Sequence, residues 1–288
     1  MKCRFVGDVG DFGKYGLLRA ISGITVNDEH RSLRLGVMWY LVPDDGKANS
    51  VRDEPHRCPR PARRLAGRGQ AGEGKFIGYL AKTSTNRRRF RECDEELYDA
   101  LAEIVSQKGR CVANVADDGI LGADAALHDE PLTYADLPRY GSAAKETRLT
   151  RRKEWFQRAL EAVRGCDVVF VDPDNGLECK SVERHHAKGP KYAYLEDLNR
   201  IADRGHSLLV YHHLSRNGRH REQIEDWRER ISAELGLSGD RVLVAWCKPY
   251  AGRAFFIIPS QRDREVFDSR FGRFKASKWC EYGHFECL

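Results

Sequence analysis

Continuous apolar runs alternate along the chain with stretches whose apolar residues recur at helical spacing. The continuous runs predict strands at residues 33–42, 110–115, 167–171, 207–211, 241–246 and 254–258. The helical spacing predicts helices at residues 11–23, 94–107, 147–163, 195–202 and 219–235. In the first of these, Asp11 is placed to cap the start and Gly23 to end the helix. Residues 116–145 show neither pattern. Strands separated by helices predict an α/β fold with a mostly parallel sheet, because parallel neighbours need crossover connections.

The end of the chain departs from this alternation. The last two predicted strands are separated only by a turn that contains Pro249 and Gly252, which predicts a C-terminal antiparallel hairpin at the edge of the sheet. With 288 residues in all, we expect a single domain over residues 1–288. A long basic loop or insertion is expected near residues 43–91, whose first part is rich in proline, glycine and arginine.

Positive charge is concentrated in this insertion, although the formal net charge of the chain is only +6. Arg87, Arg88 and Arg89 stand in a row and are candidates for contacts with the phosphates of RNA or DNA. The same cluster is equally compatible with a solvated surface, since arginine is frequent throughout the chain. The pattern therefore names nucleic acid as a candidate partner without deciding the question.

Apolar composition and cysteine spacing bear on the compartment. No apolar run approaches the roughly 20 residues of a spanning helix, and the first residues lack the apolar core of a signal peptide, so we expect a cytoplasmic protein without a membrane partner. The nine cysteines form no CxxC pair, which favours reduced thiols. Cys280, His284 and Cys287 have a spacing that a zinc ion could use if a fourth ligand were near.

Polar residues that are candidates for binding or catalysis follow three of the predicted strands. They are the loop Asp44, Asp45 and Gly46, the segment from Asp172 through Asp174 and Asn175 to Gly176, and the pair His212 and His213. Ligands of parallel sheets gather at the carboxyl ends of strands, so these residues are the first candidates for a site. Pro173 cannot continue a central ladder, which leaves the aspartates at the rim; the same residues are also common in ordinary turns.

The order of these motifs resembles that of S-adenosylmethionine-dependent methyltransferases. The segment GDVGDFGKYGLLR at residues 7–19 and the strand ending in DPDN at residues 172–175 are most similar to the ribosomal-RNA adenine N6-methyltransferases, whose motifs read GN-x-AD-x-x-KH and DPPY. The segments GDVGDFGKYGLLR and DPDNGLE also resemble a group of uncharacterised bacterial proteins, which implies no activity. The methyltransferase resemblance implies a Rossmann-like class I fold.

The resemblance also implies roles for individual residues. It implies that Lys14 lies beside the active site, that Asp11 and Tyr15 lie near S-adenosylmethionine, and that Asp172 is the catalytic aspartate. On this interpretation Asp8 and the loop Asp44, Asp45 and Gly46 would also border the cofactor. Asp174 and Asn175 would shape substrate recognition at the catalytic site, and His212 or His213 would line its opposite wall. The acceptor would be an amino nitrogen of a nucleic acid. Two positions depart from the family, because Asp174 replaces a proline and Asn175 replaces an aromatic residue that stacks on a flipped base. The loop after the first strand also has a single glycine instead of a pair.

Two other functions compete with this interpretation. Asp172, Asp174, Glu178 and Lys180 resemble the acidic and lysine residues of metal-dependent nucleases, which would use Mg²⁺ to activate water beside a phosphate, although the spacing is shorter than usual. Alternatively, the chain is a catalytically inactive module that binds nucleic acid, in which case affinity would fall with salt and no turnover would occur.

Overall fold

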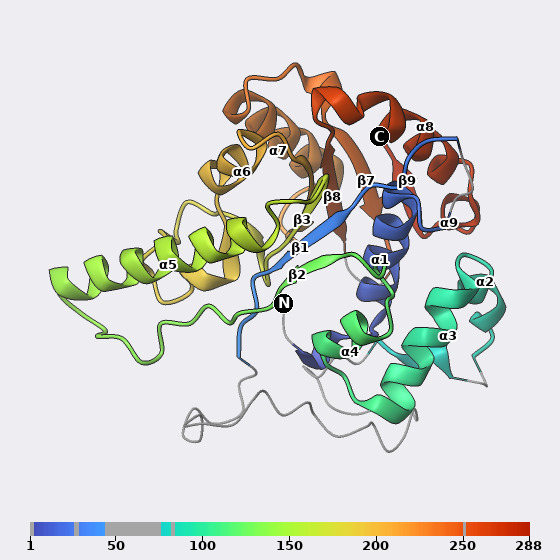
Figure 1. The fold of residues 1–288 in the computed structure, drawn as a ribbon, viewed down its shortest axis with the longest axis horizontal. Helices are drawn as coiled ribbons and strands as arrows, with labels where there is room; N and C mark the ends of the chain where they lie inside the picture. The colour runs from blue at the N-terminus through green and yellow to red at the C-terminus, as the bar shows by residue number, and fades with distance from the viewer. Residues whose placement is uncertain (1–2, 26–28, 44–75, 82–83, 250–251) are drawn as a thin grey trace.

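The fold is a three-layer α/β/α sandwich around one central sheet (Figure 1). A computed structural model describes residues 3–25, 29–43, 76–81, 84–249 and 252–288. Helices α5, α6 and α7 cover one face of the sheet, whereas α1, α3, α8 and α9 lie on the other side (Figure 1). Within the described ranges, no helix is long and apolar enough to cross a membrane.

The elements follow one another in the order that alternating patterns predict. The longer helices are α1 (Val9–Ser22), α3 (Glu95–Glu103), α5 (Ser142–Ala162), α6 (Leu195–Ala202), α7 (His220–Glu234) and α8 (Arg264–Lys275), and the short ones are α2 (Arg87–Arg91), α4 (Val112–Asp117) and α9 (Lys278–Glu281). The strands of the central sheet are β1 (Leu35–Trp39), β2 (Ala126–His128), β3 (Val168–Asp172), β6 (Ser207–His213), β7 (Leu243–Cys247), β8 (Arg253–Ile258) and β9 (Phe285–Cys287). A small separate sheet pairs β4 (Gly176–Leu177) with β5 (Tyr192–Ala193).

The central sheet has seven strands in the order β2-β1-β3-β6-β8-β7-β9. The pairs β1/β2, β1/β3 and β3/β6 are parallel, and β8 runs antiparallel to both β6 and β7. The Rossmann-like α/β prediction, including the C-terminal hairpin of β7 and β8, is therefore confirmed. The hairpin is not the edge itself, because β9 pairs with β7 beyond it.

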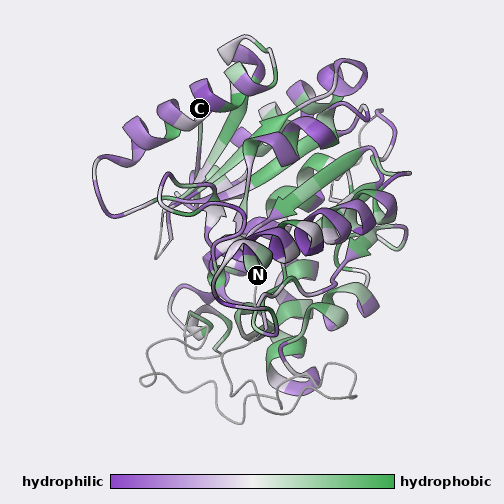
Figure 2. Ribbon diagram, turned by 90° about the vertical axis from the view of Figure 1, so that its left-hand side faces the viewer, coloured by the Kyte–Doolittle hydropathy of each residue, from purple (hydrophilic) through white to green (hydrophobic). Residues whose placement is uncertain are grey.

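Alternation along each central strand explains why helices cover both faces of the sheet. Val168 and Phe170 of β3 enter the core under α1, whereas Val169 and Val171 enter the core under α5, α6 and α7. Side chains of successive residues point to opposite faces of a strand, so a continuous apolar run needs a helical layer on each side. The strands are accordingly green inside and the outward helix faces are purple when coloured by hydropathy (Figure 2).

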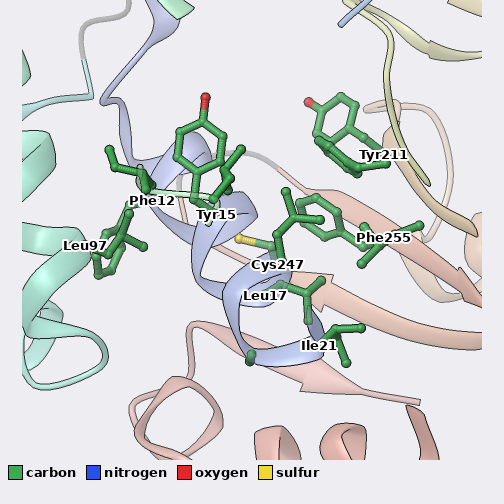
Figure 3. Packing of buried hydrophobic residues seen from close by; sticks show 14 of the residues in the cluster. Phe12, Tyr15, Leu17, Ile21, Leu97, Tyr211, Cys247 and Phe255 are labelled. Atoms are coloured by element: carbon green, nitrogen blue, oxygen red, sulfur yellow. The ribbon is translucent and has the colours of Figure 1, made fainter. Parts of the chain in front are cut away.

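Helix α1 is buried along its whole length and carries the N-terminal motif. Its Phe12 faces Leu97 of α3, while Leu17 and Ile21 lie toward the strands that carry Cys247 and Phe255 (Figure 3). The sequence pattern placed the N-cap at Asp11, which is wrong. The side chain of Asp8 accepts hydrogen bonds from the backbone N–H groups at positions 10 and 11, so the helix begins one turn earlier. The predicted C-cap, Gly23, adopts the left-handed conformation at φ 89°.

Two other local predictions need correction. The segment 110–115 was expected to be a strand, but Val112–Asp117 forms helix α4. Val112 and Val115 are three residues apart and both are buried, so the helical period brings them to one face. The segment 116–145, which had no assignment, contributes the edge strand β2, whose short length leaves little periodicity to detect.

Candidate functional site

The candidate site lies where the strand order of the sheet reverses. From β1 the chain first adds β2 on one side and later adds β3 on the other, so the carboxyl ends of β1 and β3 flank a topological switch point. Crevices at such points are the usual ligand sites of open parallel sheets. Asp172 is the last residue of β3 and is aligned with Trp39 at the end of β1.

A buried ion-pair cluster joins this strand end to α1. The Nζ atom of Lys14 lies 2.8 Å from Oδ1 of Asp11 and 2.8 Å from Oδ2 of Asp172. All three residues are at most 4% exposed. Among the described residues, Oδ1 of Asp172 accepts no hydrogen bond, so this carboxylate retains an acceptor atom. Lys14 thus links two predicted site segments that are 158 residues apart.

Burial and neighbouring charges shift the pKa values of Asp11 and Lys14 in this cluster. Burial raises the pKa of Asp11 to about 6; the attraction of Lys14 opposes the shift, and repulsion from Asp8 adds to it. Burial disfavours the charge of Lys14, but Asp11 and Asp172 outweigh it and raise the pKa of the amine above its usual value. Lys14 therefore stays a cation throughout the neutral range and cannot serve as a proton acceptor. Its role must be electrostatic or positional.

Tyr211 connects the lysine cluster to the rim of the sheet. Its ring centroid lies 5.7 Å from Nζ of Lys14, and its hydroxyl lies 3.3 Å from Nδ1 of His213. Burial raises the pKa of Tyr211 to about 12, so the phenol is neutral at physiological pH. Arg253 on the neighbouring strand β8 also interacts electrostatically with Tyr211. The sequence pattern did not single out these two residues, since a tyrosine and an arginine inside apolar strands resemble ordinary sheet residues.

A cavity of about 500 Å³ opens at the same edge of the sheet, beside the turn that follows Asp172. The residues that line it include Asp174 and Asn175, which were predicted as substrate contacts, together with His212, Tyr192 and Trp227. A volume of this order suits a small ligand or one nucleobase with surrounding water. The two turn residues after Asp172 therefore face a different space from Asp172 itself.

His212 lies on the opposite side of the sheet from Lys14 and Asp172. Successive residues of β6 alternate, so Tyr211 packs toward α1 whereas the imidazole of His212 packs 4.8 Å from the ring of Trp227 on α7. Burial lowers the pKa of His212 to about 3, and the charges of His213 and Arg230 add to the effect. The ring is therefore neutral at physiological pH.

The tautomer of His212 follows from its backbone partner. The N–H of Leu177 donates to Nδ1 of His212 at 3.0 Å, so the proton of the neutral ring resides on Nε2. Gly176 permits this contact, because it has φ +94° and a Cβ atom there would lie 2.7 Å from Nδ1. The turn at Asn175-Gly176 thus allows β4 to pack closely against the end of β6.

The outer wall of the cavity is fixed by a buried arginine of α5. Arg152 donates to Asp197 at 2.6 Å and to the carbonyl oxygens of Gly189 and Tyr192 at 3.2 and 3.1 Å. Asp197 also accepts from the N–H of Tyr194. These bonds hold the segment that leads into β5 and α6, so hydrogen bonds within the protein organise this wall.

The proposed Mg²⁺ carboxylates are held by separate cations rather than gathered around one point. Asp172 pairs with Lys14, Asp174 lies 3.3 Å from Lys191, and Glu178 lies 3.2 Å from Arg230. Lys180 is exposed. Within the part of the chain that the structure describes, no group of three or more histidine, cysteine or acidic side chains could hold a metal ion.

The spacing of Cys280, His284 and Cys287 does not produce a zinc site in the described residues either. The two thiol sulfur atoms lie 3.7 Å apart. The ring of His284 instead packs 4.5 Å from that of Phe90, and burial lowers its pKa to about 4. The spacing in the sequence does not reveal that the His284 ring is buried against Phe90 of α2.

The remaining predicted residues divide into three groups. Asp8 and Tyr15 lie beside the Lys14 cluster, with the hydroxyl of Tyr15 3.5 Å from Asp11. Asp44, Asp45 and Gly46 lie outside the described residues, as does most of the basic insertion. Arg87, Arg88 and Arg89 are on α2, where Arg88 pairs with Glu92 and Arg89 contacts Tyr282.

No protein-family model matches this chain, and no curated protein matches it significantly.

Proposed function

We propose that the protein is an S-adenosylmethionine-dependent methyltransferase that acts on an amino nitrogen of a nucleic acid. The observation that carries the proposal is the buried contact of Lys14 with Asp172 at the switch point of the sheet. The methyltransferase resemblance implied a lysine from the N-terminal motif beside an aspartate at the end of the catalytic strand. These two residues meet at 2.8 Å, although their motifs are distant in sequence.

The cofactor would bind against the start of α1. Asp8, Asp11 and Asp172 bring three carboxylates to this region, against the positive charges of Lys14 and Arg253. A cationic ligand suits this excess of carboxylates, and the sulfonium of S-adenosylmethionine is such a cation. The bound cofactor would supply an electrophilic methyl group. The loop Asp44 to Gly46, which the resemblance also assigns to the cofactor, lies outside the described residues.

The acceptor would lie across the carboxyl edge of the sheet, between Asp172 on the α1 side and the cavity on the α7 side. Asp172 retains Oδ1 as an acceptor for an amino N–H, and a carboxylate there stabilises the positive charge that develops on the nitrogen as it attacks. His212 would donate from Nε2, since Nδ1 is engaged by Leu177. Asn175 cannot stack on a base as the family's aromatic residue does. Trp227 and Tyr192 supply aromatic surface in the same cavity.

Positioning would provide most of the rate enhancement. Methyl transfer from a sulfonium needs an aligned nitrogen more than a strong acid or base, and fixed geometry contributes through effective molarity. Lys14 and Arg152 serve this purpose in different places. The first fixes the carboxylate of Asp172, and the second fixes the cavity wall through Asp197.

The proposal is tested by isothermal titration calorimetry with S-adenosylmethionine. We expect saturable binding by the wild-type protein and a loss of about tenfold or more in the Asp172→Asn variant, because a charged hydrogen-bonding partner in a buried site is replaced by a neutral one. Asp167→Asn is the matched control, since Asp167 precedes the same strand at its other end, where it pairs with Arg31. This control should bind the cofactor as the wild type does.

The outcomes separate the three functions. Absence of cofactor binding by the wild type, or equal binding by Asp172→Asn, contradicts the proposal. Uptake of Mg²⁺ that depends on Asp172, in the absence of cofactor binding, would favour a nuclease. If the cofactor binds but no methyl group reaches RNA or DNA, the site is a binding module or has another acceptor.

A further inference from the structure

The turn between β6 and α7 is held in one conformation beside the cavity. Oε1 of Gln223 accepts from the N–H of Ser215 at 2.9 Å, and its Nε2 donates to the carbonyl oxygens of Ser215 and Asn217, both at 3.1 Å. Ser215 and Gln223 both line the cavity. The turn therefore presents Arg216, which lies between these anchored residues, at a fixed place on the cavity's rim.

Arg216 differs from its basic neighbours in having no acidic partner among the described residues. Arg219 lies 3.3 Å from Glu222, and Arg221 pairs with Glu286. Arg216 is exposed, and no hydrogen bond or ion pair within the described ranges engages it. Its guanidinium group is thus available to an external anion, in contrast to those of Arg88 and Arg89 on α2.

Positive charge gathers around His213 at the same rim. Arg253 is its direct partner across the β6/β8 ladder. His213 is exposed, yet enough protein surrounds its imidazole to lower the pKa, and Arg253, Arg216 and His220 all act in the same direction. Asp174 is the acidic group that opposes them. The field at this rim therefore favours a bound anion.

Helix α7 adds to this field. It has 15 residues and begins at His220, and no side chain caps its start. The N-terminal end of a helix carries unsatisfied N–H groups and a partial positive charge, which attract phosphate. This contribution supports the basic side chains and would not suffice without them.

We propose that the rim formed by His213, Arg216, His220 and Arg253 binds a backbone phosphate of the nucleic-acid strand whose base enters the cavity. The inference rests on the proposed function for the identity of the base, and it moves the phosphate contact from α2 to the β6–α7 turn. A phosphate at the rim and a base in the cavity are the two parts of one nucleotide. Arg216 would make the charge-assisted contact that positions it.

The test measures affinity for a fluorescently labelled single-stranded RNA, and for DNA of the same sequence, over a series of salt concentrations without cofactor. Arg216→Gln is expected to weaken binding about tenfold at low salt, as the loss of one charged hydrogen bond implies. The slope of log K against log salt should fall by about 0.7, the value for one phosphate contact on a single strand. Arg204→Gln is the matched control, because Arg204 is exposed just before β6 at the other edge of the sheet. It should change neither quantity.

A second arm separates phosphate from base. Nucleoside monophosphates should lose affinity in Arg216→Gln, whereas the corresponding nucleosides should bind both proteins equally. No binding of oligonucleotides by the wild type, or an unchanged salt slope in Arg216→Gln, overturns the inference, as does an effect that appears only when Arg87, Arg88 and Arg89 are replaced. Because the cofactor is absent, a failed S-adenosylmethionine titration would contradict the proposed function while leaving a positive result here intact.

Discussion

The neutral state of His212 should make the protein lose stability when the pH falls. The folded-state pKa is about 3, against 6.5 for an ordinary histidine. Below pH 6.5 the unfolded chain binds a proton that the folded protein cannot accept, so the unfolded state is favoured. Stability from this residue is therefore fully present above pH 6.5 and is lost progressively toward pH 3.

The magnitude follows from the two pKa values. At pH 5 the ring is neutral in the folded protein and almost fully protonated in the unfolded chain. pH 5 lies about 1.5 units below the pKa of the unfolded chain, and each unit is worth about 1.4 kcal/mol. The free energy of unfolding should therefore be about 2 kcal/mol lower at pH 5 than at pH 7.5. The substitution to compare is His212→Asn, because the amide oxygen of asparagine can replace Nδ1 as the acceptor for the N–H of Leu177.

Urea unfolding at pH 7.5 and pH 5 measures the effect. The wild type should lose about 2 kcal/mol more than His212→Asn between the two pH values. Other acid-sensitive groups, such as His284, are present in both proteins and cancel in the difference. Parallel losses in the two proteins, or an NMR titration of His212 with a midpoint near its ordinary value, would refute the buried and neutral assignment.

Three further substitutions test packing and ion pairing in this fold. A Cβ atom at Gly16 would lie 2.1 Å from the ring of Trp279, so Gly16→Ala should destabilise the protein by about 1–3 kcal/mol in urea unfolding. Gly272→Ala, in an exposed helix position with nothing within 4 Å, should instead stabilise the protein by about 0.5–1 kcal/mol. If both substitutions changed the free energy of unfolding in the same direction, this account would be contradicted. Arg152→Gln should cost about 3–5 kcal/mol, because Asp197 would remain buried without its cation. A loss under 1 kcal/mol by the same assay would show that water or a neighbour compensates.

The ordered cavity wall has a consequence for function. Arg152 and Gln223 each bind several backbone oxygens of the segments that surround the cavity. Because these bonds already order the loops, the loops lose less conformational entropy when a ligand binds. The site is thus organised before a ligand arrives on the α6 and α7 side.

Local patterns were sufficient for most of the elements and for the edge at which the site lies. Helix α6 occupies the predicted residues 195–202, and the polar residues at the ends of β3 (Asp172) and β6 (His212 and His213) follow apolar runs that form central strands. The apolar periodicity of a segment and its turn-forming residues are local features, so both can be identified from the sequence. The strand predicted at residues 110–115 failed because a short apolar segment can satisfy either period.

The sequence by itself determined which polar residues stand at the carboxyl edge of the sheet, because an apolar run followed by a turn specifies where a strand ends. Only the tertiary structure decided which of them meet. The packing of α1 on one face brings Lys14 to Asp172, whereas the packing of α7 on the other draws His212 to Trp227. Adjacent strand residues point to opposite faces, so contacts of this kind depend on which helix covers each face, and that choice is made by the whole core.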